Sequence, residues 1–445
     1  MTTRRRRLRA VVPGLPVLLC LVVAACVTPA PAVALGVVPA SCTPDRTDAL
    51  ASAGVRWAGF DVAWARWEPA AGTRDDSYVE QVRRRLQVCS SRGLKVVLGM
   101  GLQYPPGWVR GLPGAEYREQ HGNASPTGPV NLVFSRAVRT AAGAYMRDLV
   151  GELGPASIDA VRIGTSVTGE LGYLGPDEGP TPDLHDFWAF DDAAQTGAGL
   201  ADGQAPSPLP GWVPGQTTWR GSSLGPERTR DWFLWYERAL ADCARWQVET
   251  LLATGYSGAF HLVLAGRGTS PRELDAAVSD RLGGEGDPQG SLERGLYYPD
   301  QIARLGAVLA PRIGRDRLVV DVTGLDDTST VRARALVPPT DRCRPDDPDR
   351  VLDAPGVETW PSYRFTAAVG RRAGLRLVGE NPGTPSSSAT GGSGESDPLV
   401  EQLRRAPAYA RGCGLETFFF AFEDDLFDAR SGVRPDDLGA TAGTP

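Results

Sequence analysis

Eight short apolar runs along the chain constrain its fold more than any other feature. Segments with helical spacing, such as residues 75–92, 135–153 and 230–253, lie between several of them. Strands that alternate with helices favour a parallel sheet, and eight such strands make a (β/α)8 barrel. The sequence therefore predicts an α/β protein, a TIM barrel with long insertions in the loops after its strands. The predicted strands are residues 33–38, 55–62, 94–98, 158–164, 259–265, 318–322, 375–378 and 417–422.

The length of the chain allows more than one arrangement of domains. A chain of 445 residues is long enough for two or three domains, but a single barrel with insertions also reaches this size. Residues 175–230 are rich in Gly and Pro, as is typical of a long loop that is either functional or disordered. We predict one barrel over 33–428, with an insertion at about 175–230 and a flexible tail at 429–445.

The first 25 residues have the features of an export signal. A cluster of arginines precedes an apolar stretch that is too short, and too interrupted by proline, to span a membrane. Residues 23–26 resemble a bacterial lipobox, in which Cys26 becomes the lipidated first residue. Cleavage after Ala34 is the alternative, but it would cut into the first strand. We expect a signal peptide at 1–25, a tether at 26–32, and an exported protein that is either anchored to the extracellular face of the cell membrane or secreted.

The net charge and the cysteines of the chain bear on its binding partners and on its disulfides. A net charge of −6 gives no support to nucleic-acid binding, and the ordinary composition excludes overall disorder. We expect a monomer that meets the membrane only through its lipid anchor. Outside the cytoplasm some of the five cysteines after Cys26 should pair, and Cys42 with Cys89 is the first expected pair. Five unrelated buried thiols are the alternative.

Two glutamates follow predicted strands in the same way. Glu170 comes after the fourth strand and Glu380 after the seventh, each preceded by glycine. Either one alone fits a surface or helix-capping carboxylate. In one barrel, however, both would lie on the face that carries the catalytic groups of this fold. A pair of carboxylates there predicts cleavage of a glycosidic bond, in which one donates a proton and the other activates water or attacks carbon.

Further residues are candidates for contact with sugar. Asp61 is a charge within an apolar strand, so it needs either an arginine partner or a polar ligand such as a sugar hydroxyl. Trp64, Trp67, Tyr104 and Trp108 cluster near the ends of neighbouring strands. These aromatic side chains fit stacking on sugar rings, and they fit the core equally.

Other chemistries lack their motifs. The three histidines have no metal-ligand spacing. Residues 164–169 place the second glycine one residue too late for a nucleophile elbow. Residues 99–101 lack the third glycine of a dinucleotide-binding fingerprint. The sequence therefore predicts a hydrolase that needs neither a metal nor a cofactor.

The chain resembles the β-amylase family of glycoside hydrolases, distantly but along most of its mature length. Residues 169–173 are similar to the segment that carries the family's general acid, and we take Tyr173 within it as a substrate contact. Residues 379–381 are similar to the segment that carries the general base. The other similar segments are 35–38, 55–68, 104–109, 232–240 and 322–325.

This resemblance implies a barrel that acts on an oligosaccharide or polysaccharide. Glu170 would protonate the glycosidic oxygen, and Glu380 would activate water, with inversion at the anomeric carbon. Asp61 would hold sugar hydroxyls, while Thr323 and Asn381 would support the general base.

Departures from the family pattern argue against starch as the substrate. Where the family has a His-Gln pair and a Gly-rich lid, Leu102-Gln103 leads directly into Tyr104. Ala421 replaces the arginine of the eighth strand, and Pro382 replaces a small residue. One alternative is the retaining clan that includes bacterial β-galactosidases, although that clan has Asn where this chain has Gly169. Another is a catalytically silent glycan-binding lipoprotein that keeps the barrel.

Overall fold

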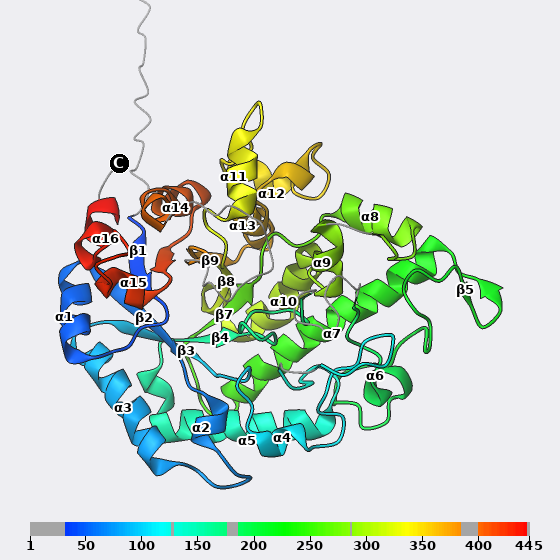
Figure 1. Cartoon of the computed structure of the whole chain (residues 1–445), viewed down its shortest axis with the longest axis horizontal. Coiled ribbons are helices and arrows are strands. Elements are labelled where there is room, and N and C mark those ends of the chain that lie inside the picture. Colours follow the sequence, from blue (N-terminus) through cyan, green and yellow to red (C-terminus); the bar gives the residue numbers. More distant parts are fainter. Residues whose placement is uncertain (1–31, 126–128, 176–185, 285–286, 384–398, 443–445) are drawn as a thin grey trace, which may run out of the picture. The chain divides into compact units, whose positions relative to one another are not determined.

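Eight parallel strands close into a barrel in the order β1-β10-β9-β8-β7-β4-β3-β2 (Figure 1). The structure is a computed structural model that describes residues 32–125, 129–175, 186–284, 287–383 and 399–442. The predicted (β/α)8 fold is confirmed, and each predicted strand overlaps an observed one. The barrel strands are β1 (Ala34–Val37), β2 (Val55–Asp61), β3 (Lys95–Gly99), β4 (Ala160–Ile163), β7 (Ala259–Leu264), β8 (Leu318–Val322), β9 (Arg376–Glu380) and β10 (Thr417–Phe420).

Helices follow the strands and cover the outside of the barrel (Figure 1). In α3 the apolar positions recur at helical spacing and are buried, and Asp75 caps its first turn by accepting from the backbone N–H groups of Ser77 and Tyr78. The helices are α1 (Pro44–Ser52), α2 (Trp64–Trp67), α3 (Asp76–Ser91), α4 (Gly107–Arg110), α5 (Arg136–Leu153), α6 (Asp192–Thr196), α7 (Pro226–Leu252), α8 (Pro271–Ser279), α9 (Asp287–Glu293), α10 (Tyr298–Ile313), α11 (Thr328–Ala335), α12 (Asp347–Arg350), α13 (Ser362–Arg372), α14 (Leu399–Cys413), α15 (Glu423–Phe427) and α16 (Pro435–Ala442).

The barrel interior has an apolar layer and a charged layer. Successive side chains of a strand point to opposite faces, so alternate residues fill the interior. The apolar layer is Val97, Ala160, Val319, Val378 and Phe419. The charged layer, nearer the carboxyl ends of the strands, is Asp61, Arg162, His261, Asp321 and Glu380.

Two glycines make room for these layers. A Cβ atom on Gly36 would lie 2.3 Å from the ring of Phe419. A Cβ atom on Gly99 would lie 1.7 Å from Oδ1 of Asp61. Glycine at position 99 therefore leaves space inside the barrel for the Asp61 carboxylate.

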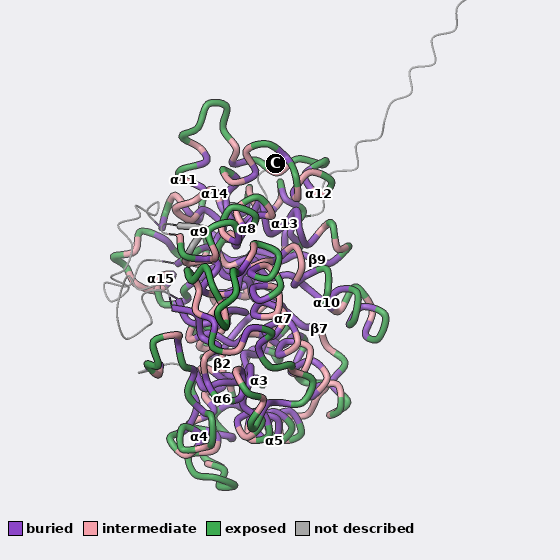
Figure 2. Tube along the Cα trace, turned by 90° about the vertical axis from the view of Figure 1, so that its right-hand side faces the viewer, coloured by how far each residue is buried: buried purple, intermediate pink, exposed green. Residues whose placement is uncertain are grey.

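The segment predicted as a long insertion is largely packed where the structure describes it, from residue 186 onward. It contains α6 and a short hairpin of β5 (Thr218–Trp219) and β6 (Ser222–Ser223). Trp188 and Trp212 are fully buried, and Trp212 packs edge-on against Trp232 of α7, with 5.3 Å between ring centroids. Much of this segment therefore belongs to the core. Buried residues run through the middle of the molecule, and exposed residues lie mainly at its edges (Figure 2).

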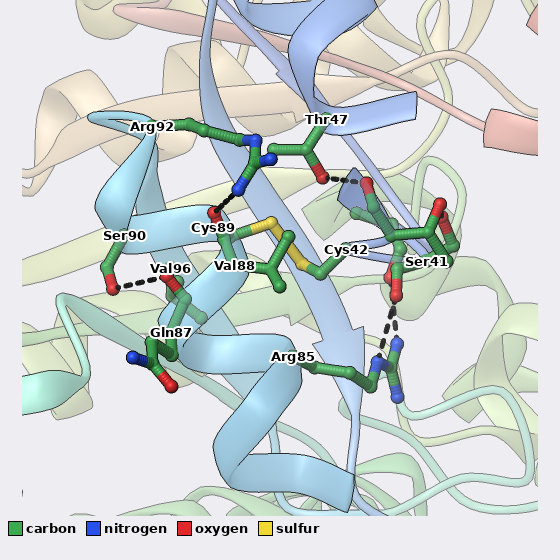
Figure 3. The surroundings of a disulfide bond; sticks show 12 residues. Ser41, Cys42, Thr47, Arg85, Gln87, Val88, Cys89, Ser90, Arg92 and Val96 are labelled. Atoms are coloured by element: carbon green, nitrogen blue, oxygen red, sulfur yellow. Dashed lines mark hydrogen bonds between the residues drawn. A yellow bond between two sulfur atoms is a disulfide. The ribbon is translucent and has the colours of Figure 1, made fainter. Parts of the chain in front are cut away.

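Two disulfides join distant parts of the chain. The expected bond between Cys42 and Cys89 is present, and it ties the segment after β1 to α3 (Figure 3). A second bond, between Cys343 and Cys413, was not predicted, because sequence alone does not fix connectivity. Cys243 is buried in α7 and is the free cysteine within the described residues.

The C-terminal segment differs from the prediction. Instead of a flexible tail, the described part of 429–445 contains α16, which packs against α1, α14 and β1. Pro435 begins the helix, and Leu438 is fully buried. The composition of the segment does not reveal that it forms a helix packed on the barrel.

Cys26 and the predicted leader lie outside the described residues. Within those residues, no helix combines the length and apolar character that a membrane crossing requires.

Candidate active site

A cavity of about 690 Å³ opens at the carboxyl ends of the barrel strands. Segments that follow β2, β3, β4, β8, β9 and β10 contribute to its wall. It brings together several predicted site residues from distant parts of the sequence. These are Asp61, Tyr104, Glu170, Thr323, Glu380 and Asn381.

Glu380 ends β9 and is buried, with 8% of its surface exposed. Arg162 of β4 donates two hydrogen bonds to its carboxylate, from Nη1 to Oε2 and from Nη2 to Oε1, each 3.1 Å long. Burial raises the pKa of Glu380, the positive charge of Arg162 opposes that rise, and the charges of Asp321 and Glu170 add to it. The site thus holds a fixed carboxylate that is more basic than a glutamate in water.

Glu170 lies on a tight turn after β4. The backbone N–H groups of Thr165 and Ser166 donate to its backbone carbonyl, 2.8 and 2.9 Å away. Gly169 takes a φ of 79°, a conformation that favours glycine. A Cβ atom on Gly164 would lie 1.9 Å from the carbonyl oxygen of Gly169. The small residues before Glu170 therefore allow the chain to fold back on itself and present the glutamate to the cavity.

Three side chains hold the Glu170 carboxyl group. The Thr323 hydroxyl lies 2.8 Å from Oε1, and the Thr168 hydroxyl donates to Oε2 over 2.8 Å. Arg294, in the segment after α9, donates to Oε2 over 3.2 Å. Each glutamate of the pair therefore has its own arginine.

The predicted support for Glu380 is arranged differently. Thr323 contacts Glu170, so its expected place on the Glu380 side is wrong. The Asn381 side chain donates to the carbonyl of Ala421 and accepts from its backbone N–H group, at 2.9 and 2.8 Å. Asn381 lies at the cavity, but these hydrogen bonds hold the end of the eighth barrel strand.

Asp61 ends β2 and faces the cavity. The Gln103 side-chain amide donates to Oδ2 of Asp61 over 3.0 Å. Within the described part of the chain, Asp61 forms no ion pair within 4.0 Å, so the arginine salt bridge that its sequence context allowed is not formed. Burial raises the pKa of Asp61, and the charges of Arg162 and Arg85 oppose the rise.

The aromatic candidates divide into one cavity residue and several core residues. Tyr104 is 47% exposed and lines the cavity. Trp64 is fully buried and stacks on Tyr145 with 5.1 Å between centroids. Trp108 packs edge-on against Trp64 and donates its indole N–H to the carbonyl of Glu68. Trp64, the first residue of α2, and Trp108 therefore pack against each other and do not line the cavity.

Tyr173 also belongs to the core. It is 1% exposed, stacks on Tyr236 with 4.1 Å between centroids and packs on Phe134. Its hydroxyl donates to the backbone carbonyl of Tyr236 over 3.0 Å. The prediction that Tyr173 contacts substrate is therefore wrong for this arrangement.

Several site residues escaped the sequence analysis. Arg162, His261 and Asp321 each interrupt an apolar strand, the same signal that marked Asp61. His261 Nδ1 lies 3.3 Å from Asp321 Oδ2. Burial alone would raise the pKa of Asp321, but this contact and the charge of Arg162 outweigh it and lower the pKa. Arg294 lies in a loop and carries no comparable signal.

Comparisons with known proteins bear on the fold. No protein-family model matches the chain, and no curated protein matches its sequence. The catalytic domain of β-amylase from Paenibacillus polymyxa is similar in structure, with a TM-score of 0.53, 15% identity, and coverage of 92% of this chain and 96% of that one. A β-galactosidase from Halorubrum lacusprofundi has a TM-score of 0.54 at 14% identity, with coverage of 92% and 57%.

A β-galactosidase from Marinomonas ef1 has a TM-score of 0.50 at 13% identity, with coverage of 87% of this chain and 54% of that one. The chain thus spans nearly all of the amylase domain and little more than half of either galactosidase. At these identities the likeness shows that the barrel fold is shared.

Proposed function

We propose that the chain is a glycoside hydrolase in which Glu170 is the general acid and Glu380 the general base. One observation carries the proposal: glutamates at the ends of the fourth and seventh barrel strands face one cavity, each fixed by its own arginine. Glycosidic cleavage by two carboxyl groups needs a proton donor and a second, ionised carboxylate. The shared fold with a β-amylase domain and two β-galactosidases is consistent with this reaction.

We assign Glu170 as the general acid because residues 169–173 resemble the segment that carries the general acid of the β-amylase family. The Thr323 hydroxyl lies 2.8 Å from Oε1 of Glu170 and 2.9 Å from the carbonyl oxygen of Leu264. A hydroxyl has one proton to donate, and a carbonyl oxygen can only accept. Thr323 can therefore donate to either oxygen, and together with Thr168 and Arg294 it fixes the Glu170 carboxyl group at the cavity. We propose that Glu170, held in this way, passes a proton to the leaving oxygen.

The surroundings of Glu380 favour the opposite role. Two parallel hydrogen bonds from Arg162 stabilise the ionised carboxylate and fix its plane. Its raised pKa makes it a stronger base for a proton of water. The same ion pair would also suit a nucleophile, so a retaining mechanism is the second candidate. Gly169, in place of the Asn of the retaining clan, favours inversion.

The other polar groups of the cavity fit a sugar. Asp61 and Gln103 offer hydrogen-bond acceptors and donors to ring hydroxyls, and Tyr104 offers an exposed ring for stacking. Phe422, after the eighth strand, is 44% exposed and also lines the cavity. We propose that these groups bind the sugar next to the scissile bond.

A glycan panel tests the proposal. The wild-type protein should release product whose anomeric form, followed by NMR from the start of the reaction, shows inversion. Glu170→Gln and Glu380→Gln should each lose at least a hundredfold in kcat, in line with the size of acid–base catalysis. Glu416→Gln, an exposed partner of Arg376 at the other end of the barrel, is the matched control. Unchanged turnover in either site variant would refute the mechanism, whereas retention would assign Glu380 as a nucleophile.

We further propose that the protein acts outside the cytoplasm, through a lipid anchor on Cys26. The two disulfides support an oxidising compartment. A Cys26→Ser protein should leave the membrane fraction, and its persistence there would refute the anchor.

A further inference from the structure

We infer that the glycan bound in this cavity carries an anionic group, a carboxylate or a sulfate, that binds to Arg66 and Arg85. The inference rests on the proposed function, because it names the class of substrate for the same cavity. It follows from two cations in one wall that have no carboxylate partner.

Arg66 and Arg85 line the cavity on the side of β2, beside Tyr78. The Cζ atom of Arg66 lies 4.1 Å from the ring centroid of Tyr78, and that of Arg85 lies 3.9 Å from the ring centroid of Phe60. Contact with an aromatic face leaves the N–H groups at the edge of a guanidinium free to donate. The two rings therefore hold the arginines in place without consuming their hydrogen bonds.

Neither arginine is neutralised by contact with a carboxylate. Among the described residues, neither has a carboxylate oxygen within 4.0 Å. Arg66 donates to the Gln81 side chain over 3.1 Å. Arg85 donates to the backbone carbonyls of Ala40 and Ser41 over 2.8 and 3.3 Å (Figure 3). These partners are uncharged, so both positive charges remain available.

The other two arginines at the site show the contrast. Arg162 is paired with Glu380 and Arg294 with Glu170. Their charges serve the catalytic glutamates. Arg66 and Arg85 take no part in these two pairs, and Asp61 acts on Arg85 without an ion pair.

Arg85 has the stronger need of a partner, because it is partly buried. Burial lowers its pKa, while Glu423 and Asp61 act on it only at longer range. Glu423 is already engaged by Arg46, at 3.1 Å, and by the backbone N–H group of Ser41, at 2.9 Å. A guanidinium matches the geometry of carboxylates and sulfates through paired hydrogen bonds. An anionic substituent of the glycan would supply the negative charge that the partly buried Arg85 lacks in direct contact.

Binding to the Glu380→Gln variant measures this site without turnover. Calorimetry would compare oligogalacturonates with the same oligosaccharides after reduction of their carboxylates to alcohols, and chondroitin sulfate oligosaccharides with their desulfated forms. We expect at least one anionic form to bind about tenfold more tightly than its neutral counterpart at low salt. The difference should shrink near 1 M salt, where the screening length falls to about 3 Å.

Arg66→Met in the same background should remove most of that difference, and Arg85→Lys should retain part of it. Arg84→Met is the matched control, because Arg84 precedes Arg85 on α3, is 64% exposed and pairs with Glu80. Equal affinity for anionic and neutral forms in both glycan series would overturn the inference. An Arg66→Met protein that discriminates as well as Arg84→Met would do the same.

The outcomes separate this inference from the proposed function. Arginine-dependent binding of an anionic glycan that the wild-type protein does not cleave would support the anion site and count against the glycosidase. Cleavage of a neutral glycan that depends on Glu170 and Glu380 but not on Arg66 or Arg85 would support the glycosidase and overturn the anion site.

Discussion

Arg162 of the fourth barrel strand donates both of its terminal N–H groups to Glu380 of the seventh, across the inside of the barrel. Both side chains are largely buried, with 14% and 10% of their surfaces exposed. Residues inside the barrel therefore influence the pKa of Glu380 at the cavity. For each substitution of these residues, the direction of the pKa change can be predicted.

Replacing Arg162 by Met should raise the pKa of Glu380 further, because the opposing positive charge is lost. The acid limb of kcat/KM should move to higher pH by about one unit or more. A carboxyl group with a raised pKa in the folded state favours its protonated form. The contribution of Glu380 to the stability of the variant is therefore greatest at low pH and is lost as pH rises through that pKa. The loss at neutral pH should be roughly 3–5 kcal/mol, measured by urea unfolding at several pH values. An acid limb that does not move would contradict the role of Arg162.

Replacing Asp321 by Asn should have the opposite effect on the acid limb. The charge of Asp321 contributes to the raised pKa of Glu380, so its removal should lower that pKa. The acid limb of kcat/KM should move to lower pH, as measured in the same buffers as Arg162→Met. If the acid limb moved in the same direction for Arg162→Met and Asp321→Asn, the cause would be disruption of the barrel and not the change of charge.

Replacing Thr323 by Val should remove the hydroxyl that lies between Glu170 and the carbonyl of Leu264. We expect kcat/KM to fall about tenfold for a sugar leaving group, which needs a proton, and much less for a nitrophenolate, which does not. Thr323→Ser keeps the hydroxyl and should retain most of the activity. Equal losses for both leaving groups would argue against a part in proton donation.

Replacing Gly99 by Ala should displace Asp61, because the new methyl group would lie 1.7 Å from its Oδ1 atom. We expect a loss of about 1–3 kcal/mol in the free energy of unfolding, together with a higher KM. Gly151→Ala is the control, since Gly151 lies within α5 and a Cβ atom there meets nothing within 4 Å. That control should gain about 0.5–1 kcal/mol. A raised KM without loss of stability would place the effect on Asp61 alone.

The sequence analysis predicted the barrel and the pair of glutamates because both leave local signals. Short apolar runs mark the strands, and strand order alone places Glu170 and Glu380 at one end of a closed sheet. The pairing of Arg162 with Glu380 spans 218 residues, so no local pattern reports it. Trp64 and Tyr173 were misplaced because their burial depends on contacts with α5 and α7, which form only in the folded chain. The helix α16 was missed for the same reason.

The Cys42–Cys89 disulfide lies one helical turn from Arg85 on α3, and Arg85 binds the carbonyls just before Cys42 (Figure 3). A covalent bond and an arginine thus fasten the same short segment to the same helix. We therefore expect the position of Arg85, and with it the proposed anion site, to depend on this disulfide. Titration with dithiothreitol should weaken binding of an anionic glycan while the barrel stays folded by circular dichroism. The affinity for a charged ligand would then depend on whether the Cys42–Cys89 disulfide forms in the compartment where the protein folds.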